Sequence, residues 1–292
     1  MRTHLMLAST LLTVVLFVAG CDRDGAGEAV ARDGNSQNEP VAAAPQEVVV
    51  RTRDYTFEAP DTIWSGPTTI RLVNEGPDFH HVWLVRLESG RTVGDLVSLL
   101  TSGEEAMPDW AVDFGGPNTP GAPGESTVAT IDLKPGDYAM ICVIPAPDGQ
   151  LHVMKGMFRP LAVIPGDGPT AAMPAADLVM TLDDYSFETD RPITPGHHTL
   201  RVENVAAQAH EVVIVRLQPG RTAGDFLNWV MTRKGESPGK PVGGVTGLAR
   251  GVSNVIEVDF EPGEYALLCF VPDAGDGQPH VAHGMVKQFR IG

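Results

Sequence analysis

The stretch CVIPAPDGQLHVMKGM, residues 142–157, places a cysteine, a histidine and a methionine close together in a chain that has three cysteines in all. A second stretch of the same kind, CFVPDAGDGQPHVAHGM, runs from 269 to 285. Each follows a Pro-Gly turn signal and an apolar run, PGDYAMIC (135–142) and PGEYALLC (262–269), which is typical of a strand entered from a turn. Such a series indicates either a metal site or a structural turn that occurs twice.

The chain is a tandem duplication, as its two halves show. TIRLVNEGPDFHHVWLVRLESGRTVGDLVSLL (69–100) matches TLRVENVAAQAHEVVIVRLQPGRTAGDFLNWV (199–230) at a separation of 130 residues. The later parts of the copies match at separations of 127 and 128 residues. Because a fixed separation indicates a repeated structural unit, we expect two domains, residues 47–165 and 178–292. The segment 166–177 is then the linker between them.

Each copy has the pattern of a small all-β domain. Short apolar or alternating runs, rich in β-branched residues and separated by Pro and Gly, are typical of the strands of a sandwich. One short helix interrupts them, which Thr92 or Thr222 can cap, with Asp95 or Asp225 three residues further on. The expected fold class is therefore all-β: two tandem β-sandwiches, each with a short inserted helix.

The balance of charge argues against nucleic acid as a partner. The 292 residues include 21 Lys and Arg against 37 Asp and Glu, which gives a formal charge of -16. This excess of acid repels a phosphate backbone. A partner protein with a basic surface is one explanation of the charge, and solubility is the other.

The N-terminus has the pattern of an export signal. Residues 1–20 contain Arg2, an apolar run without acids and small residues just before Cys21. The run is shorter than the roughly 20 apolar residues of a spanning helix. VAGC (18–21) resembles the lipobox of bacterial lipoproteins, which implies a signal peptide over 1–20 and a lipid on Cys21. The protein is then anchored in the bacterial cell envelope, on its periplasmic or extracytoplasmic face. An uncleaved anchor or an ordinary signal peptide is the alternative.

Residues 21–46 are rich in Gly, Ala, Asp and Pro and show no apolar period. This composition is typical of a flexible tether.

With Cys21 assigned to the lipid, Cys142 and Cys269 remain at matching positions of the two copies. In an exported protein an unpaired cysteine requires an explanation. The residues alone leave three open: a disulfide between the copies, a buried apolar side chain, or a thiolate that binds a metal.

Most of each copy resembles the cupredoxin, or blue copper, family. PGDYAMIC and PGEYALLC, each followed by a His and then Gly-Met, carry the resemblance. NEGPDFHHVWLV (74–85) and NVAAQAHEVVIV (204–215) add an Asn followed by a His and an apolar run. The resemblance implies a Greek-key sandwich and one copper ion in each copy, held by two imidazoles, a thiolate and a weak thioether. The ligands that it implies are His80, Cys142, His152 and Met157 in the first copy and His210, Cys269, His280 and Met285 in the second.

The repeat distinguishes the two neighbouring histidines of the first copy. His80 matches His210, whereas His81 matches Glu211. Because adjacent residues of a strand face opposite ways, we expect His81 to face solvent.

The loop from Cys to His is longer than in familiar cupredoxins. Nine residues separate Cys142 from His152, and ten separate Cys269 from His280. The sequences PDG and DGQ within it favour a tight turn, which would fold the excess out and return the His to the site. A cupredoxin-like loop without metal is the alternative.

The function that these features predict is electron transfer through type 1-like copper sites, with a redox or copper-exchange protein as partner. A periplasmic copper buffer or delivery protein and a metal-free scaffold or binding module are the alternatives. Catalysis is not expected, because the copper oxidases and nitrite reductases of this fold need further copper centres, marked by His-x-His pairs or a His beside the Cys. Neither occurs here, and the chain has no P-loop or dinucleotide fingerprint.

Overall fold

The computed structural model describes residues 43–102, 107–166 and 171–292. The signal peptide expected over residues 1–20, Cys21 and nearly all of the tether lie outside these residues. Within them, no helix has the length and apolar character needed to span a membrane.

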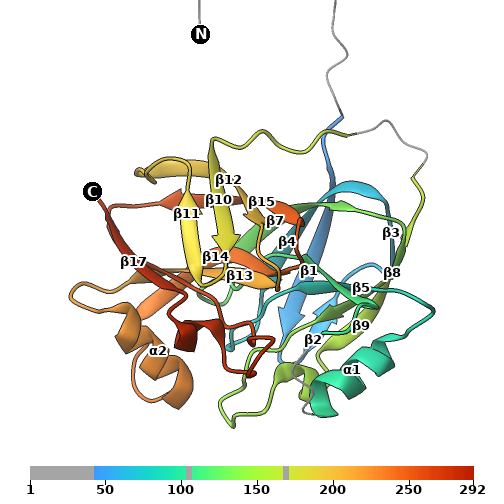
Figure 1. Ribbon diagram of the computed structural model, residues 1–292, viewed down its shortest axis with the longest axis horizontal. Helices are drawn as coiled ribbons and strands as arrows, with labels where there is room; N and C mark the ends of the chain where they lie inside the picture. The colour runs from blue at the N-terminus through green and yellow to red at the C-terminus, as the bar shows by residue number, and fades with distance from the viewer. Residues whose placement is uncertain (1–42, 103–106, 167–170) are drawn as a thin grey trace, which may run out of the picture. The chain divides into compact units, whose positions relative to one another are not determined.

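Two sheets run through the described residues (Figure 1). The first has eight strands, which pair in the order β11 (Ser186–Thr189), β10 (Leu178–Asp183), β12 (Gly196–Asn204), β15 (Ser253–Phe260), β7 (Ser126–Leu133), β4 (Gly66–Asn74), β1 (Gln46–Arg53) and β2 (Thr56–Glu58). The second has nine, in the order β17 (Val286–Ile291), β16 (Gly263–Leu268), β13 (His210–Leu217), β14 (Gly239–Leu248), β6 (Ala111–Gly115), β5 (Trp83–Leu87), β8 (Gly136–Ile141), β9 (Phe158–Ile164) and β3 (Thr62–Trp64).

Side-chain alternation explains how the sheets pack. In β4 every second residue from Thr68 to Asn74 is buried, as expected of a strand with one face on a core. The largest cluster of buried apolar residues draws on both sheets and both copies and includes Ile70, Leu84, Ile214 and Leu267, and each copy has a smaller cluster besides. The all-β fold class expected from the sequence is confirmed.

Among the described residues, one short α-helix interrupts each copy. They are α1 (Val93–Ser102) and α2 (Ala223–Thr232), and a single 3-10 turn follows later in each copy, η1 (His152–Lys155) and η2 (His280–His283). The Thr222 hydroxyl accepts a hydrogen bond from the Asp225 amide, and the Asp225 carboxylate accepts one from the Thr222 amide. Thr92 and Asp95 make the same reciprocal bonds. The caps predicted from the sequence are confirmed.

The two copies pair through equivalent residues. In the β7–β15 pair Ala129 lies opposite Ile256, and these positions match at the repeat separation of 127 residues. Pro117 forms a bridge with Val245, each of them following the Gly-Gly pair of its copy. Antiparallel pairing of equivalent residues places a local two-fold axis between the copies. Both sheets therefore continue from one copy into the other.

Candidate metal centre

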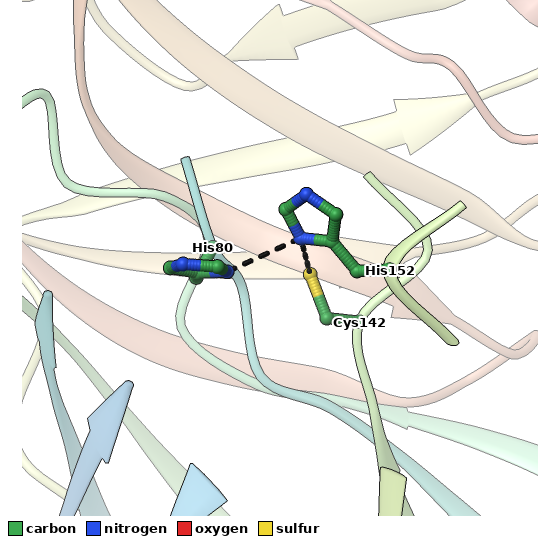
Figure 2. A group of neighbouring side chains, drawn as sticks. All are labelled: His80, Cys142 and His152. Atoms are coloured by element: carbon green, nitrogen blue, oxygen red, sulfur yellow. Dashed lines mark hydrogen bonds between the residues drawn. The ribbon is translucent and has the colours of Figure 1, made fainter. Parts of the chain in front are cut away.

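Three of the four predicted ligands of the first copy converge in the interior (Figure 2). Nδ1 of His80 lies 3.2 Å from Nδ1 of His152, and Sγ of Cys142 lies 3.4 Å from the same Nδ1. All three residues are fully buried. Two imidazole nitrogens and one sulfur thus face a common point, as Figure 2 shows.

The second copy repeats this arrangement. Nδ1 of His210 lies 2.9 Å from Nδ1 of His280, and Sγ of Cys269 lies 3.3 Å from Nδ1 of His280 and 3.9 Å from that of His210. These residues are fully buried as well. Cys142 and Cys269 are both free, so the disulfide that the sequence left open is not formed.

The long Cys-to-His loop folds back on itself, as the turn sequence predicts. The amide of Ala146 donates to the carbonyl of Gln150, and the amide of Gly149 donates to the carbonyl of Ala146. Just outside this turn, the amide of His152 donates to the carbonyl of Ile144 at 3.0 Å. These bonds fold the extra residues of the loop into a turn, so that His152 lies next to Cys142.

Met157 and Met285 are fully buried. The amide of Cys142 donates to the carbonyl of Met157, and the amide of each Met donates to the carbonyl of the second His of its copy, His152 or His280. This network places each Met backbone beside the other ligands. The role of the two thioethers as axial ligands stays a prediction.

Burial sets the protonation of the donors. It lowers the pKa of His152 and of His280 to about 4, so that both imidazoles are neutral at neutral pH. Burial also raises the pKa of the Cys142 thiol to about 12 and that of Cys269 as well. Neutral imidazoles with free lone pairs and a thiol that a metal can deprotonate match a soft transition metal such as copper.

A carboxylate holds the outer nitrogen of the first His in each copy. Nε2 of His80 lies 2.8 Å from Oδ1 of Asp54, and Nε2 of His210 lies 3.0 Å from Oδ1 of Asp184. A carboxylate there favours the tautomer with its proton on Nε2, which leaves Nδ1 free for a metal. No role is predicted for these two aspartates from the sequence, although the Asp-Tyr pair that both copies share, in DYTFEA (54–59) and DYSFET (184–189), is the signal that points to them.

The tyrosine of each Asp-Tyr pair lies over the second His. The ring centroids of Tyr55 and His152 are 4.6 Å apart, and those of Tyr185 and His280 are 5.4 Å apart. The Tyr55 hydroxyl donates to Asp78 at 3.2 Å. Each second His thus has a phenol ring packed against it.

His81 does not face solvent, and that prediction is wrong. Its side chain is 5% exposed, and its Nε2 accepts a hydrogen bond from the amide of Val143 at 3.1 Å. Glu211 does the same in the second copy, accepting from the amide of Phe270 at 2.9 Å. The alternation rule fails because His81 precedes β5, and because a register shift interrupts β13 just after His210. Both residues hold the peptide that follows the Cys.

Replacing His81 by Ala leaves the partly buried amide of Val143 without its acceptor, which should lower the free energy of unfolding by about 1–3 kcal/mol. Urea denaturation of the metal-free protein measures this change. His81→Gln keeps an acceptor and should recover most of the loss. The control is His197→Ala at an exposed residue, which should change stability by less than about 0.5 kcal/mol. Equal stability of the Ala variant and the wild type would contradict the role given to His81.

A third group of possible ligands, Asp273, Asp276 and His283, lies on the loop of the second copy. His283 lies 3.1 Å from Asp276, and its counterpart Lys155 pairs with Asp148 in the first copy. A side-chain hydrogen bond that closes the loop therefore explains this group.

The surroundings of the two centres differ. The first is flanked by residues of α2 and its C-cap from the other copy: Trp229 packs on Phe79 with centroids 5.8 Å apart, and Arg233 donates to the carbonyl of Pro145 at 3.2 Å. The second copy has Ala209 in place of Phe79. The same contact cannot form there.

No protein-family model and no curated protein sequence matches the chain. Among solved structures, the chain is similar to reduced auracyanin from Roseiflexus castenholzii, with 20% identity, a TM-score of 0.29 and coverage of 39% of this chain and 94% of that one. It is also similar to the copper-containing nitrite reductase of Thermus scotoductus, with 13% identity, a TM-score of 0.25 and coverage of 85% and 62%. A third is the blue copper oxidase of Nitrosomonas europaea, with 14% identity, a TM-score of 0.23 and coverage of 84% and 85%. These neighbours are cupredoxin-fold proteins, and the two His-Cys-His groups of this chain have the ligand types of a type 1 copper site.

Proposed function

We propose that the chain is a membrane-tethered, extracytoplasmic copper protein that transfers electrons through one type 1-like site in each copy. The observation that carries the proposal is the convergence of two Nδ1 atoms and one Sγ, which occurs once in each copy. A copper ion held there would supply one-electron redox chemistry. Lipidation of Cys21 would provide the tether.

The way in which the ligands are held favours electron transfer over copper delivery. The imidazoles and thiols are fully buried, and the first His of each copy is fixed by a carboxylate on its outer nitrogen. Ligands fixed by packing and hydrogen bonds rearrange little when the charge of a bound ion changes, which favours fast electron exchange. A delivery protein has to exchange ligands with an acceptor, and buried donors hinder that exchange.

We propose further that the chain is not an enzyme. The neighbours of the cysteines are Ile141 and Val143 in the first copy and Leu268 and Phe270 in the second. No imidazole beside the thiolate therefore links the site to a second, catalytic metal. The formal charge of -16 favours a redox partner with a basic surface.

The test is a titration of the reduced, signal-less protein with Cu(II). We expect two equivalents of copper per chain, an intense visible band from the sulfur–copper bond, and loss and return of the band on reduction and reoxidation. Metal content of the purified protein and voltammetry complete the measurement. A band that is bleached once and does not return, with Cu(I) passing to an acceptor, would instead indicate copper delivery. The absence of any copper binding would exclude both.

A further inference from the structure

We propose that Asp78 and Asp273 are equivalent positioning residues, each of which is held by a phenol and places a negative charge beside the outer nitrogen of the second metal-binding His of its copy. This inference rests on the proposed function, because it concerns how the copper sites are tuned. It adds to the site two carboxylates that do not occupy matching positions in the repeat.

The two carboxylates occupy the same place over the ligand. Oδ2 of Asp78 lies 3.8 Å from Nε2 of His152, and Oδ2 of Asp273 lies 3.7 Å from Nε2 of His280. Both Nε2 atoms are buried, and neither has a hydrogen-bond partner among the described residues. In each copy a carboxylate thus lies near an otherwise unpaired nitrogen.

The phenol completes the arrangement in both copies. The Tyr55 hydroxyl donates to Oδ2 of Asp78 at 3.2 Å, and the Tyr185 hydroxyl donates to Oδ2 of Asp273 at 2.5 Å. In each case the oxygen that accepts from the phenol is also the one that faces the imidazole. The tyrosine therefore fixes the carboxylate and also contacts the imidazole ring.

The two carboxylates come from different parts of the repeat. Asp78 precedes the first His of its copy, and Gln208 stands at that position in the second copy. Asp273 lies in the Cys-to-His loop, where the first copy has Ala146. The backbone is nevertheless the same at both positions. The side chain of Asn74 donates to the carbonyl of residue 78, and that of Asn204 donates to the carbonyl of residue 208. In the same way, the backbone of residue 146 closes the turn of the first loop and that of residue 273 closes the turn of the second.

A packing accident does not explain this exchange. The second copy has Gln208 where the first has Asp78, and its Cys-to-His loop supplies Asp273 instead. A negative charge therefore lies near the second His of both copies, although it comes from different sequence positions. Gln208 also helps to hold the carboxylate that replaces Asp78, because its Nε2 donates to Oδ2 of Asp273 at 3.1 Å. A negative charge kept at the same place in both copies indicates that this charge has a role at the metal site.

The chemistry of the site gives the charge a role. A carboxylate beside Nε2 favours a proton on that nitrogen and leaves Nδ1 free to bind metal. Its negative charge also attracts Cu(II) more strongly than Cu(I). Loss of the carboxylate should therefore weaken Cu(II) binding and raise the reduction potential of the site.

The test uses the full chain with Cys269→Ser, so that only the first site reports. Asp78→Ala should lower Cu(II) affinity by about 10- to 100-fold, measured by competition with a chelator, and should raise the midpoint potential, measured by voltammetry. Adding Ala146→Asp to Asp78→Ala copies the second centre and should restore both values most of the way. Asp132→Ala, which removes an exposed acid of β7, should change the affinity by less than about threefold, since exposed charges are well screened.

Unchanged affinity and potential in Asp78→Ala would overturn the inference, as would failure of the folded double variant to recover. Circular dichroism of the metal-free variants shows whether they fold. If Ala146→Asp does not fold, the reciprocal pair in the second copy, Asp273→Ala with and without Gln208→Asp, decides the question in a Cys142→Ser background, where only the second site reports. If the parent protein binds no copper, the proposed function fails. If it binds copper and these variants do not differ from it, only the positioning role fails.

Discussion

Replacing Cys142 by Ser is expected to remove about half of the visible absorbance of the copper-loaded protein. The band arises from the bond between sulfur and copper, and neither His nor Met supplies it. Because Cys269 belongs to a separate His-Cys-His group, its share of the band should remain. The double variant should be colourless. Absorption spectra at known copper content measure these shares.

The other ligands provide matched comparisons for this result. Met157→Leu should keep the colour and shift the reduction potential, because an axial thioether tunes the site without holding the metal. His197→Ala removes an exposed imidazole and should change neither. Wild-type protein that stays colourless with Cu(II), although its thiols are reduced, would rule out the blue-copper assignment. Loss of all colour in the single Cys142 variant would show instead that the sites are not independent.

The second copy expressed alone, residues 178–292, is expected to form a two-fold dimer. In the full chain β15 pairs with β7, and Ala129 lies opposite the equivalent Ile256. Removing the first copy exposes this strand edge and the apolar surface beneath it, which favours pairing with another edge. Because equivalent residues already pair, a second copy of the same half can take the missing place with little change.

Light scattering coupled to gel filtration measures the mass of the half. The control is an equimolar mixture of residues 47–165 and 178–292, which should give a one-to-one complex, since it rebuilds the pairs of the full chain. A folded monomer at tens of micromolar would contradict the prediction and show that each sandwich is closed without its sister.

The local patterns of the sequence predict the elements and the ligand types. Alternating apolar residues give the strands, and the Thr-x-x-Asp pattern gives the caps at Thr92 and Thr222. The match between the copies separates His80 from His81 as the ligand candidate, and the structure places His80 with Cys142 and His152. These features depend on residues close together in the chain, or on comparison of one copy with the other.

The environment of His81 and the carboxylates around the two sites depend on contacts between segments that are distant in the sequence, so the sequence did not predict them. His81 is turned inward, where its acceptor nitrogen binds an amide 62 residues further along the chain. The alternation of side chains along a strand does not predict such a partner. Asp54 reaches His80 across 26 residues. Comparison of the copies could not find Asp78 and Asp273 either, because it assumes that equivalent groups stand at equivalent positions.

The sequence by itself determined that the chain is duplicated, that each copy is built of strands with one capped helix, and that each carries two His, a Cys and a Met with the chemistry of a copper site. Only the tertiary structure decided that the loop turn returns each second His to its Cys, that both sheets continue through both copies, and that different segments place a carboxylate over His152 and His280. The physical reason is that hydrophobic period and turn chemistry are local, whereas a ligand's surroundings are set by whichever segments the fold brings within a few ångströms.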